Sequence, residues 1–191
     1  AYTIGSCSGR EGWTILKSFD YVIFGAGIFG MYAAKLLAEG GYSAAVVEQD
    51  VTAFTRASSI NQARVHHGYH YPRSIATAMK CAQYYNRFCS DFPFAVNQKF
   101  QKIYAVAAQR SMVDAAYFKR FCDYLHIPAQ EIDSRMYFNP DRVEGAFITE
   151  EVSFDAAKIK RWFLDYFREQ PRIELFYGMS LSSAEPMGDG M

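Results

Sequence analysis

The stretch "FDYVIFGAGIFGMYAAKLLAEGGYSAAVVEQD", Phe19–Asp50, decides the fold. Residues 21–24 form a short continuous apolar run that stops at glycine, which is typical of a strand buried on both faces. The pattern becomes helical from Ile28, and the glycine pair at 40–41 supplies a left-handed stop. A second apolar strand follows over residues 43–49. This order of strand, glycine turn, helix and strand predicts a βαβ unit.

Three glycines and one acid within this unit are spaced as a dinucleotide requires. Gly25 lets the chain turn tightly, and Gly27 lets a pyrophosphate approach the backbone amides at the positive end of the helix. Gly30 allows the helix to pack closely on the sheet. Glu48 lies 18 residues after Gly30, near the ~20 expected for the acid that hydrogen-bonds a ribose 2′-hydroxyl. The pattern predicts adenine-dinucleotide binding and disfavours NADP, whose 2′-phosphate the carboxylate would repel; a tight turn without a ligand is the alternative.

Composition excludes several classes of protein. Half of the 191 residues are hydrophobic and 17% are aromatic, which argues against disorder. Lys+Arg and Asp+Glu each number 20, so no net charge attracts nucleic acid. No apolar run approaches the ~20 residues of a membrane span, and the first 18 residues, a leader or extension, do not resemble a signal peptide. The four cysteines show no metal-ligand spacing. We therefore expect a cytoplasmic protein with no metal site.

The segment after Glu48 departs from a nicotinamide-binding domain. Such a domain would continue with alternating strands and helices. Residues 49–74, "QDVTAFTRASSINQARVHHGYHYPRS", are instead polar and lack any long apolar period. A segment of this kind is typical of a functional loop.

These motifs resemble the FAD-dependent oxidoreductases of the D-amino-acid oxidase superfamily. The resemblance covers residues 19–75 with specific motifs, including "HHGYHYPRS" from His66, and residues 76–181 only by the order of elements. Ala63 stands where the family often has glycine, and His67 stands where it has a small residue. The resemblance implies FAD as the cofactor.

The resemblance also implies which residues contact FAD. Arg64 has a second interpretation, as a partner in a surface salt bridge, and Leu181 would offer backbone hydrogen bonds to adenine. The implied cofactor-binding residues are Gly25, Gly27, Ile28, Phe29, Gly30, Glu48, Gln49, Arg56, Ser58, Ser59, Asn61, Gln62, Arg64, Val65 and Leu181.

Three residues are implied to lie nearest the flavin ring: His66, His70 and Tyr71. In a few relatives a histidine in this region is covalently joined to the flavin; a non-covalent neighbour and a structural histidine are the other interpretations of His66. His70, Tyr71 and Arg73 could face substrate, and Arg73 could equally be solvated.

The remaining patterns predict alternating elements. Ile75, Ala78, Met79, Ala82, Tyr85 and Cys89 form one apolar face of a helix that begins after Ser74, a face that we expect in the core. Further predicted elements are a strand at 99–108, a helix from a capping box at Ser111 and Asp114, a strand at 145–153, a helix at 155–169 and a third parallel strand at 172–177.

We therefore expect an α/β architecture: a Rossmann-like FAD-binding domain with a parallel sheet, plus part of an inserted α+β substrate domain. The predicted boundaries are 1–18 for the extension, 19–93 for the FAD-binding unit with its flavin loop and first long helix, 94–153 for the partial substrate domain, and 154–191 for the return to the first domain. Full-length relatives need roughly as much chain again, so the sequence is expected to be truncated.

The resemblance implies an oxidoreductase that oxidises a C–N or C–O bond of a small amino- or hydroxy-acid-like substrate by hydride transfer to flavin N5. The loop arginines hint at an anionic substrate. Two alternatives are a non-catalytic, truncated dinucleotide-binding module that associates through surface left by missing chain, and an NAD-dependent dehydrogenase, against which the missing run of βα units counts.

Overall fold

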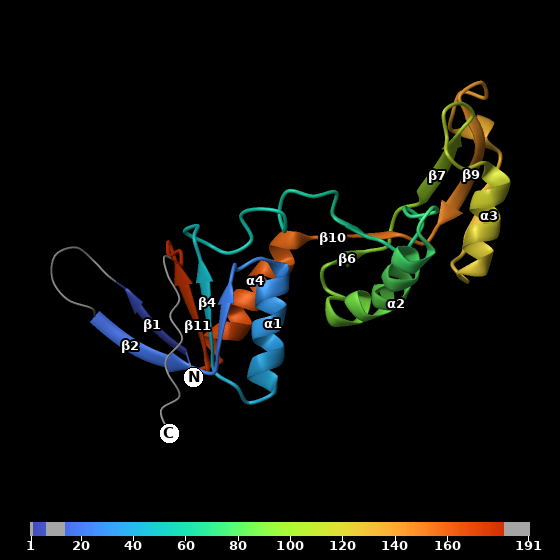
Figure 1. Ribbon diagram of the computed structural model, residues 1–191. Helices are drawn as coiled ribbons and strands as arrows, with labels where there is room; N and C mark the ends of the chain where they lie inside the picture. The colour runs from blue at the N-terminus through green and yellow to red at the C-terminus, as the bar shows by residue number, and fades with distance from the viewer. Residues whose placement is uncertain (1, 7–13, 182–191) are drawn as a thin grey trace. The chain divides into compact units, whose positions relative to one another are not determined.

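The computed structural model describes residues 2–6 and 14–181 (Figure 1). Contacts divide these residues into two compact units. The first unit comprises the described residues up to Asn61 together with those from Ala156 onward, and the second is Gln62–Asp155. The boundaries expected from the sequence lie elsewhere, and that domain assignment stays a prediction.

A three-stranded parallel sheet in the order β11-β4-β3 forms the centre of the first unit. Its strands are β3 (Tyr21–Phe24), β4 (Ala44–Glu48) and β11 (Ile173–Tyr177). All five residues of β4 are buried, as expected for the central strand of a sheet covered on both faces. The predicted Rossmann-like parallel sheet, with its third strand supplied from far along the chain, is confirmed. The expectation that residues 21–24 are buried on both faces is wrong, because β3 is an edge strand and Tyr21 and Phe24 are exposed.

Two helices cover this sheet. Helix α1 (Ile28–Glu39) packs against β3 and β4, and Figure 1 shows α4 (Ala156–Arg168) beside it. Met31 of α1 and Phe163 of α4 are fully buried. Helix α1 ends at the predicted glycine pair, where Gly41 takes the left-handed conformation with φ +83°. The sequence therefore predicted both this helix and the residue type that stops it.

The described residues before β3 form an antiparallel pair of strands, β1 (Tyr2–Ser6) and β2 (Thr14–Phe19). The Nζ of Lys17 lies 2.7 Å from Oε1 of Glu174, and the ring of Phe19 meets that of Phe176 edge-on with centroids 6.1 Å apart. Both contacts join β2 to β11, so the described part of the segment expected to be an extension belongs to the first unit.

The second unit contains two small antiparallel sheets. One has the order β7-β9-β8, with β7 (Lys102–Ala107), β9 (Val143–Thr149) and β8 (Ala129–Ile132). The other has the order β5-β10-β6, with β5 (Arg64–Val65), β10 (Val152–Phe154) and β6 (Val96–Asn97). The helices are α2 (Ile75–Asp91), α3 (Ala115–Tyr124) and the 3₁₀ turn η1 (Ser134–Met136).

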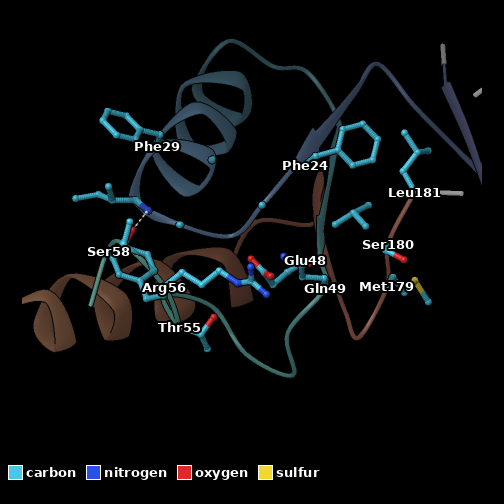
Figure 2. Close-up of a pocket in the computed structure, with 17 residues that line it drawn as sticks. Phe24, Phe29, Glu48, Gln49, Thr55, Arg56, Ser58, Met179, Ser180 and Leu181 are labelled. Atoms are coloured by element: carbon cyan, nitrogen blue, oxygen red, sulfur yellow. Dashed lines mark hydrogen bonds between the residues drawn. The ribbon is translucent and has the colours of Figure 1, made fainter. Parts of the chain in front are cut away.

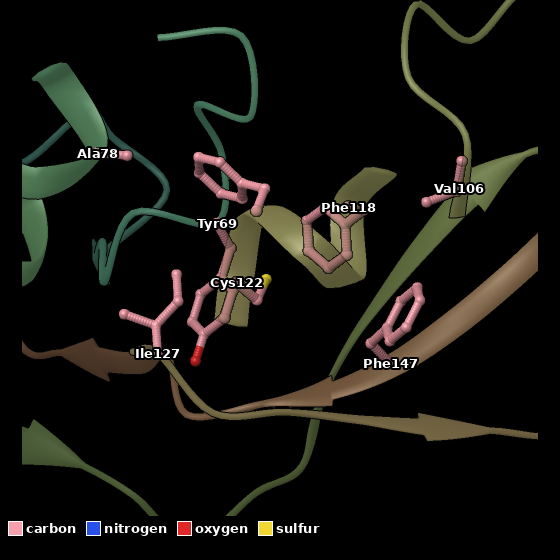
Figure 3. Packing of buried hydrophobic residues seen from close by; sticks show 8 residues of the cluster. Tyr69, Ala78, Val106, Phe118, Cys122, Ile127 and Phe147 are labelled. Atoms are coloured by element: carbon pink, nitrogen blue, oxygen red, sulfur yellow. The ribbon is translucent and has the colours of Figure 1, made fainter. Parts of the chain in front are cut away.

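An aromatic cluster forms the core of the second unit (Figure 3). The rings of Phe118 and Phe147 lie 5.0 Å apart between α3 and β9, and Cys122 is fully buried beside them. Tyr69 is also fully buried, and its hydroxyl donates to the carbonyl oxygen of Pro128 at 2.5 Å. This pairing satisfies the one polar atom that the ring brings into the core.

Two expectations about the helices of this unit are wrong in detail. Ala78 of α2 is fully buried and Ala82 packs against the core cluster, but Ile75 and Met79 are 43% and 55% exposed. The two alanines of that face therefore meet the core, and Ile75 and Met79 do not. The N-cap residue of α3 is Asp114, whose side chain accepts a hydrogen bond from the backbone N–H of Tyr117 at 2.5 Å. The expected capping partner, Ser111, lies outside the helix, because its hydroxyl bonds locally to Val113.

Within the described residues no helix has the length and apolar character that crossing a membrane requires. The three cysteines described are unpaired: Cys122 is buried, and Cys81 and Cys89 are half-buried. Cytoplasmic localisation stays a prediction.

Candidate functional site

The glycine turn brings β3 and α1 into close contact. Gly25 has φ +99°, a conformation that favours glycine, and its N–H donates to the carbonyl oxygen of Val47 at 2.7 Å. A Cβ on Gly30 would lie 2.0 Å from the carbonyl oxygen of Gly25. Only glycine at position 30 therefore permits this approach of helix to turn, as the spacing predicts.

The start of α1 leaves backbone amides available to an anion. Gly27 is the N-cap residue and supplies no side-chain cap, so the amides of the first turn have no partner within the helix. Ser58 accepts from the N–H of Ile28 at 2.9 Å. A Cβ on Gly27 would lie 3.1 Å from the Ser58 hydroxyl oxygen, so a side chain there would crowd the helix start. These features match a phosphate-binding helix terminus.

Glu48 is the last residue of β4 and is 7% exposed. Its Oε2 accepts from the N–H of Ala26 at 2.7 Å, and its Oε1 accepts from the N–H of Asp50 at 3.0 Å. The carboxylate thus braces the glycine turn from the neighbouring strand. It also faces the cavity described below, where the predicted ribose contact would lie.

A short polar cluster follows β4. The Nε of Arg56 donates to Oδ2 of Asp50 at 3.0 Å, and the Thr55 hydroxyl donates to the same oxygen. The Arg56 guanidinium and then the Thr55 hydroxyl hold the pKa of Asp50 below its ordinary value. With its amide oxygen turned toward Arg56, Gln49 accepts from that guanidinium at 3.0 Å and 3.1 Å. The loop therefore holds Arg56 along the cavity through two acceptors.

A cavity of about 560 Å³ opens at the carboxyl ends of β3 and β4 (Figure 2). This volume lies within the ~300–1,000 Å³ of small-molecule and cofactor sites, and the carboxyl edge of a parallel sheet is where such folds bind ligands. Its lining residues are Phe24, Gly25, Gly27, Ile28, Phe29, Gly30, Val47, Glu48, Gln49, Phe54, Thr55, Arg56, Ala57, Ser58, Met179, Ser180 and Leu181.

Most of the predicted cofactor-binding residues in the first unit line this cavity. They are Gly25, Gly27, Ile28, Phe29, Gly30, Glu48, Gln49, Arg56, Ser58 and Leu181. Ser59 and Asn61 do not line it: the Ser59 hydroxyl donates to the carbonyl oxygen of Phe54, and the Asn61 amide donates to that of Ala57 at 2.8 Å. These two side chains brace the loop that carries Ser58.

Sequence reasoning missed seven lining residues: Phe24, Val47, Phe54, Thr55, Ala57, Met179 and Ser180. Met179 could have been inferred only from the sheet, because its N–H donates to the carbonyl oxygen of Glu48 at 3.0 Å. Phe54 adopts φ +61°, which is uncommon for a bulky residue and has no sequence signal.

Gln62, Arg64 and Val65, the other residues expected to contact the cofactor, lie in the second unit. Arg64 and Val65 form β5. Ala63, where the family pattern often has glycine, has φ +52°, the left-handed conformation that glycine adopts without strain. The backbone thus follows the family pattern although the side chain departs from it.

The three candidates nearest the flavin ring lie together. The rings of His66 and His70 are stacked with centroids 5.5 Å apart, and the Tyr71 ring meets both edge-on. Nδ1 of His70 lies 3.1 Å from the Tyr104 hydroxyl oxygen, and Nδ1 of His66 lies 3.2 Å from Oε1 of Glu151. Sequence reasoning missed both of these partners.

A second cavity, of about 440 Å³, lies within the second unit beside His66. Its lining is mainly aromatic and apolar, with basic side chains among it. The lining residues are Arg64, Val65, His66, Lys80, Cys81, Tyr84, Tyr85, Phe88 and Phe154.

His67, at the second departure from the family pattern, packs flat on the Tyr85 ring with centroids 3.9 Å apart. Burial lowers the pKa of the His67 imidazole. This histidine is therefore a packing element between α2 and its loop.

The parallel sheet, glycine turn and acid define a Rossmann-like nucleotide-binding class of protein. The chain belongs to the family described as FAD dependent oxidoreductase (DAO), whose model matches residues 20–189. FAD is the cofactor of this family, which confirms the cofactor expected from the resemblance.

Curated relatives match the chain in part. The chain is 32% identical over 97 residues to the FAD-dependent monooxygenase FPY4 of Fusarium mangiferae, covering 51% of this chain and 26% of that protein. It is 35% identical over 83 residues to the FAD-dependent monooxygenase kojA of Aspergillus flavus, covering 44% of this chain and 19% of that protein. The matched regions thus span about a quarter or less of these relatives.

Solved structures share the fold. An L-α-glycerophosphate oxidase from Mycoplasma pneumoniae with FAD bound has a TM-score of 0.75 at 16% identity, covering 91% of this chain and 48% of that one. A glycine oxidase from Geobacillus kaustophilus has a TM-score of 0.67 at 15% identity, covering 84% of this chain and 46% of that one. The chain therefore spans about half of these structures.

The residues present fit FAD. The first-turn amides of α1 that follow Ile28 have no partner within the helix, and Gly27 places no side chain in front of them. Together they form a cradle for a pyrophosphate. Glu48, buried at the cavity wall, is the acid expected beside a ribose. No group of three or more histidine, cysteine, aspartate or glutamate side chains in the described ranges could hold a metal ion.

Proposed function

We propose that the cavity of the first unit holds the adenine dinucleotide part of FAD, and that the protein oxidises a C–N or C–O bond of a small amino- or hydroxy-acid-like substrate. The observation that carries this proposal is the start of α1. Gly27 and Gly30 line one cavity with a buried acid, and the first-turn amides that follow Ile28 have no partner within the helix. When bound, FAD supplies the hydride acceptor, its N5 atom.

In this proposal, residues of the first unit bind the dinucleotide, and residues of the second unit act on the substrate. The helix start and Ser58 bind and orient the pyrophosphate, and Glu48 binds the ribose. Arg56, held by Asp50 and Gln49, adds a positive charge at the cavity wall. The backbone of Leu181 is the proposed adenine contact, because it lines the same cavity.

The second unit supplies the proposed residues near the reacting carbon. His66, His70 and Tyr71 form one cluster of ring systems that can accept or donate protons. Arg64 and Lys80 border the cavity beside His66, which favours a substrate with negative charge. Arg64, Val65 and Gln62 also remain proposed flavin contacts.

The curated relatives favour a second candidate for the reaction of the reduced flavin with its electron acceptor. Both are FAD-dependent monooxygenases, so a reaction in which O₂ is consumed and one oxygen atom enters the product is the alternative to simple oxidation.

The experiment is anaerobic mixing of the FAD-loaded chain with amino acids, N-methyl amines and hydroxy acids, followed by the visible absorption of oxidised flavin. We expect one class to remove this absorption faster than it does for free FAD. A loaded chain that dithionite reduces but no substrate class reduces would contradict the proposed activity of this chain. Readmission of O₂ with analysis of the product then separates oxidation from oxygen insertion.

A further inference from the structure

Glu151, between β9 and β10 in the second unit, is a buried acid that the sequence does not single out. It is 3% exposed, and its side chain is fully buried. A buried carboxylate is costly unless charged or hydrogen-bonding groups compensate it. Its partners therefore indicate why the protein keeps it.

Strand register places this acid beside the loop of candidate residues. Val152 of β10 pairs with Val65 of β5, and Ser153 pairs with Arg64, in an antiparallel ladder. The residue before Val152 must then stand next to the residue after Val65, which is His66. The observed contact agrees: Oε1 of Glu151 lies 3.2 Å from Nδ1 of His66.

The second carboxylate oxygen of Glu151, Oε2, has weaker interactions than Oε1. Nη1 of Arg64 lies 4.0 Å from Oε2, which is too long for a hydrogen bond. Among the residues that the structure describes, Oε2 has no hydrogen-bond partner. His66 is therefore the side chain that Glu151 holds directly, while Arg64 provides a countercharge.

This contact determines the position of the histidine proton. An ionised carboxylate can only accept hydrogen bonds, so the nitrogen that faces it must carry hydrogen. In a neutral imidazole the other nitrogen then carries the lone pair. We propose that Glu151 is a positioning residue: it holds His66 as the Nδ1–H tautomer and leaves Nε2 as the nitrogen that can accept a proton.

The surroundings of His66 are consistent with a positioned ring. His70 stacks on it, Tyr71 meets its edge, and Arg64 lies on the adjoining strand. His66 also lines the second cavity, so it is accessible to a small molecule. That Nε2 acts on a substrate rests on the proposed function; the position of the proton does not.

The test is the tautomer of His66, measured by ¹⁵N and ¹³C NMR of the chain with labelled histidine, at a pH where the imidazoles are neutral. We expect Nδ1–H in about tenfold excess or more, the scale of one hydrogen bond to a charged group. In Glu151→Leu this excess should disappear, whereas Glu151→Gln, which keeps an acceptor oxygen, should retain it.

Glu150→Leu is the matched control, because it removes the neighbouring carboxyl group, which is exposed. It should leave the His66 tautomer unchanged. A wild-type His66 with its proton on Nε2 would overturn the proposal even if the leucine variant did not fold. The same tautomer in wild type and Glu151→Leu would overturn it as well.

A second arm separates this proposal from the proposed function. Glu151 does not line the cavity of the first unit, so Glu151→Leu should keep its FAD affinity while substrate reduces the flavin at least tenfold more slowly. An unchanged reduction rate would overturn the positioning role. If the wild type binds no FAD, the proposed function fails, and the NMR comparison still decides where the proton lies.

Discussion

Replacing Gly30 by alanine tests the close contact between α1 and the glycine turn. The new methyl carbon would lie 2.0 Å from the carbonyl oxygen of Gly25 and 3.2 Å from Cγ2 of Ile23. The first distance is about 1 Å short of the 3.0 Å below which real Cβ contacts essentially do not occur. Because the obstacle is backbone, no side-chain rotation can relieve it.

The magnitude follows from two opposing effects. Alanine is favoured over glycine in a helix by about 1 kcal/mol. Overpacking costs about 1–3 kcal/mol, and a clash with backbone belongs at the upper end of that range. We therefore expect a net loss of about 2 kcal/mol of unfolding free energy, which lowers the melting temperature by about 4–8 °C. Distortion of the pyrophosphate cradle should weaken FAD binding by about tenfold or more.

Gly40→Ala, at the C-cap of the same helix, is the matched control. Gly40 has φ −76°, which any residue adopts, and its nearest neighbour is Cδ2 of the Tyr42 side chain at 3.2 Å. That ring can move, so alanine should leave the stability unchanged or raise it by up to about 1 kcal/mol, with FAD binding intact. Thermal unfolding and FAD titration of both variants provide the comparison. Equal melting temperatures and equal FAD affinities would refute the packing argument.

Three further predictions concern single side chains. Glu48→Gln must turn an amide NH₂ toward one of the two backbone N–H groups that the carboxylate now accepts from. The variant should therefore lose about 1–3 kcal/mol of stability in urea unfolding and bind FAD about tenfold more weakly. Unchanged stability and unchanged FAD affinity would contradict the proposed role of Glu48 in holding the glycine turn. Tyr69→Phe leaves the carbonyl of Pro128 without its hydrogen-bond donor, so urea unfolding should show a loss of about 1–2 kcal/mol of stability. Unchanged stability would contradict this prediction. Burial raises the pKa of the Cys122 thiol to about 12, so the reactive thiolate is scarce at any pH well below that value. Alkylation followed by mass spectrometry at neutral pH should therefore find Cys122 protected until the chain unfolds, and rapid native labelling would disagree.

The parallel sheet could be predicted because its signals are local. Continuous apolar runs marked β3 and β4, and the residue types at Gly25, Gly30 and Gly41 matched the left-handed or close-packed positions that the structure contains. Where one residue type satisfies a backbone requirement, sequence reasoning needs no knowledge of distant parts of the chain.

The parts that could not be predicted depend on long-range contacts. Ile75 and Met79 have the spacing of a core face, but periodicity does not say whether a partner covers it. Phe54 lines the cavity and adopts a left-handed backbone conformation, which the residue type does not predict. Glu151 became visible only through the register of β5 and β10, which joins residues far apart in sequence.

The central claim is that this chain holds FAD at the start of α1. Its most direct test is the visible spectrum of the chain after incubation with FAD and removal of free ligand, with NAD⁺ treated in parallel. We predict retained flavin absorption approaching one FAD per chain and no retained NAD⁺. Acid precipitation of the loaded chain then shows how the flavin is held. Colour in the supernatant means non-covalent FAD, and colour in the pellet means a covalent link such as one to His66. A folded, colourless chain that retains no FAD would contradict the account.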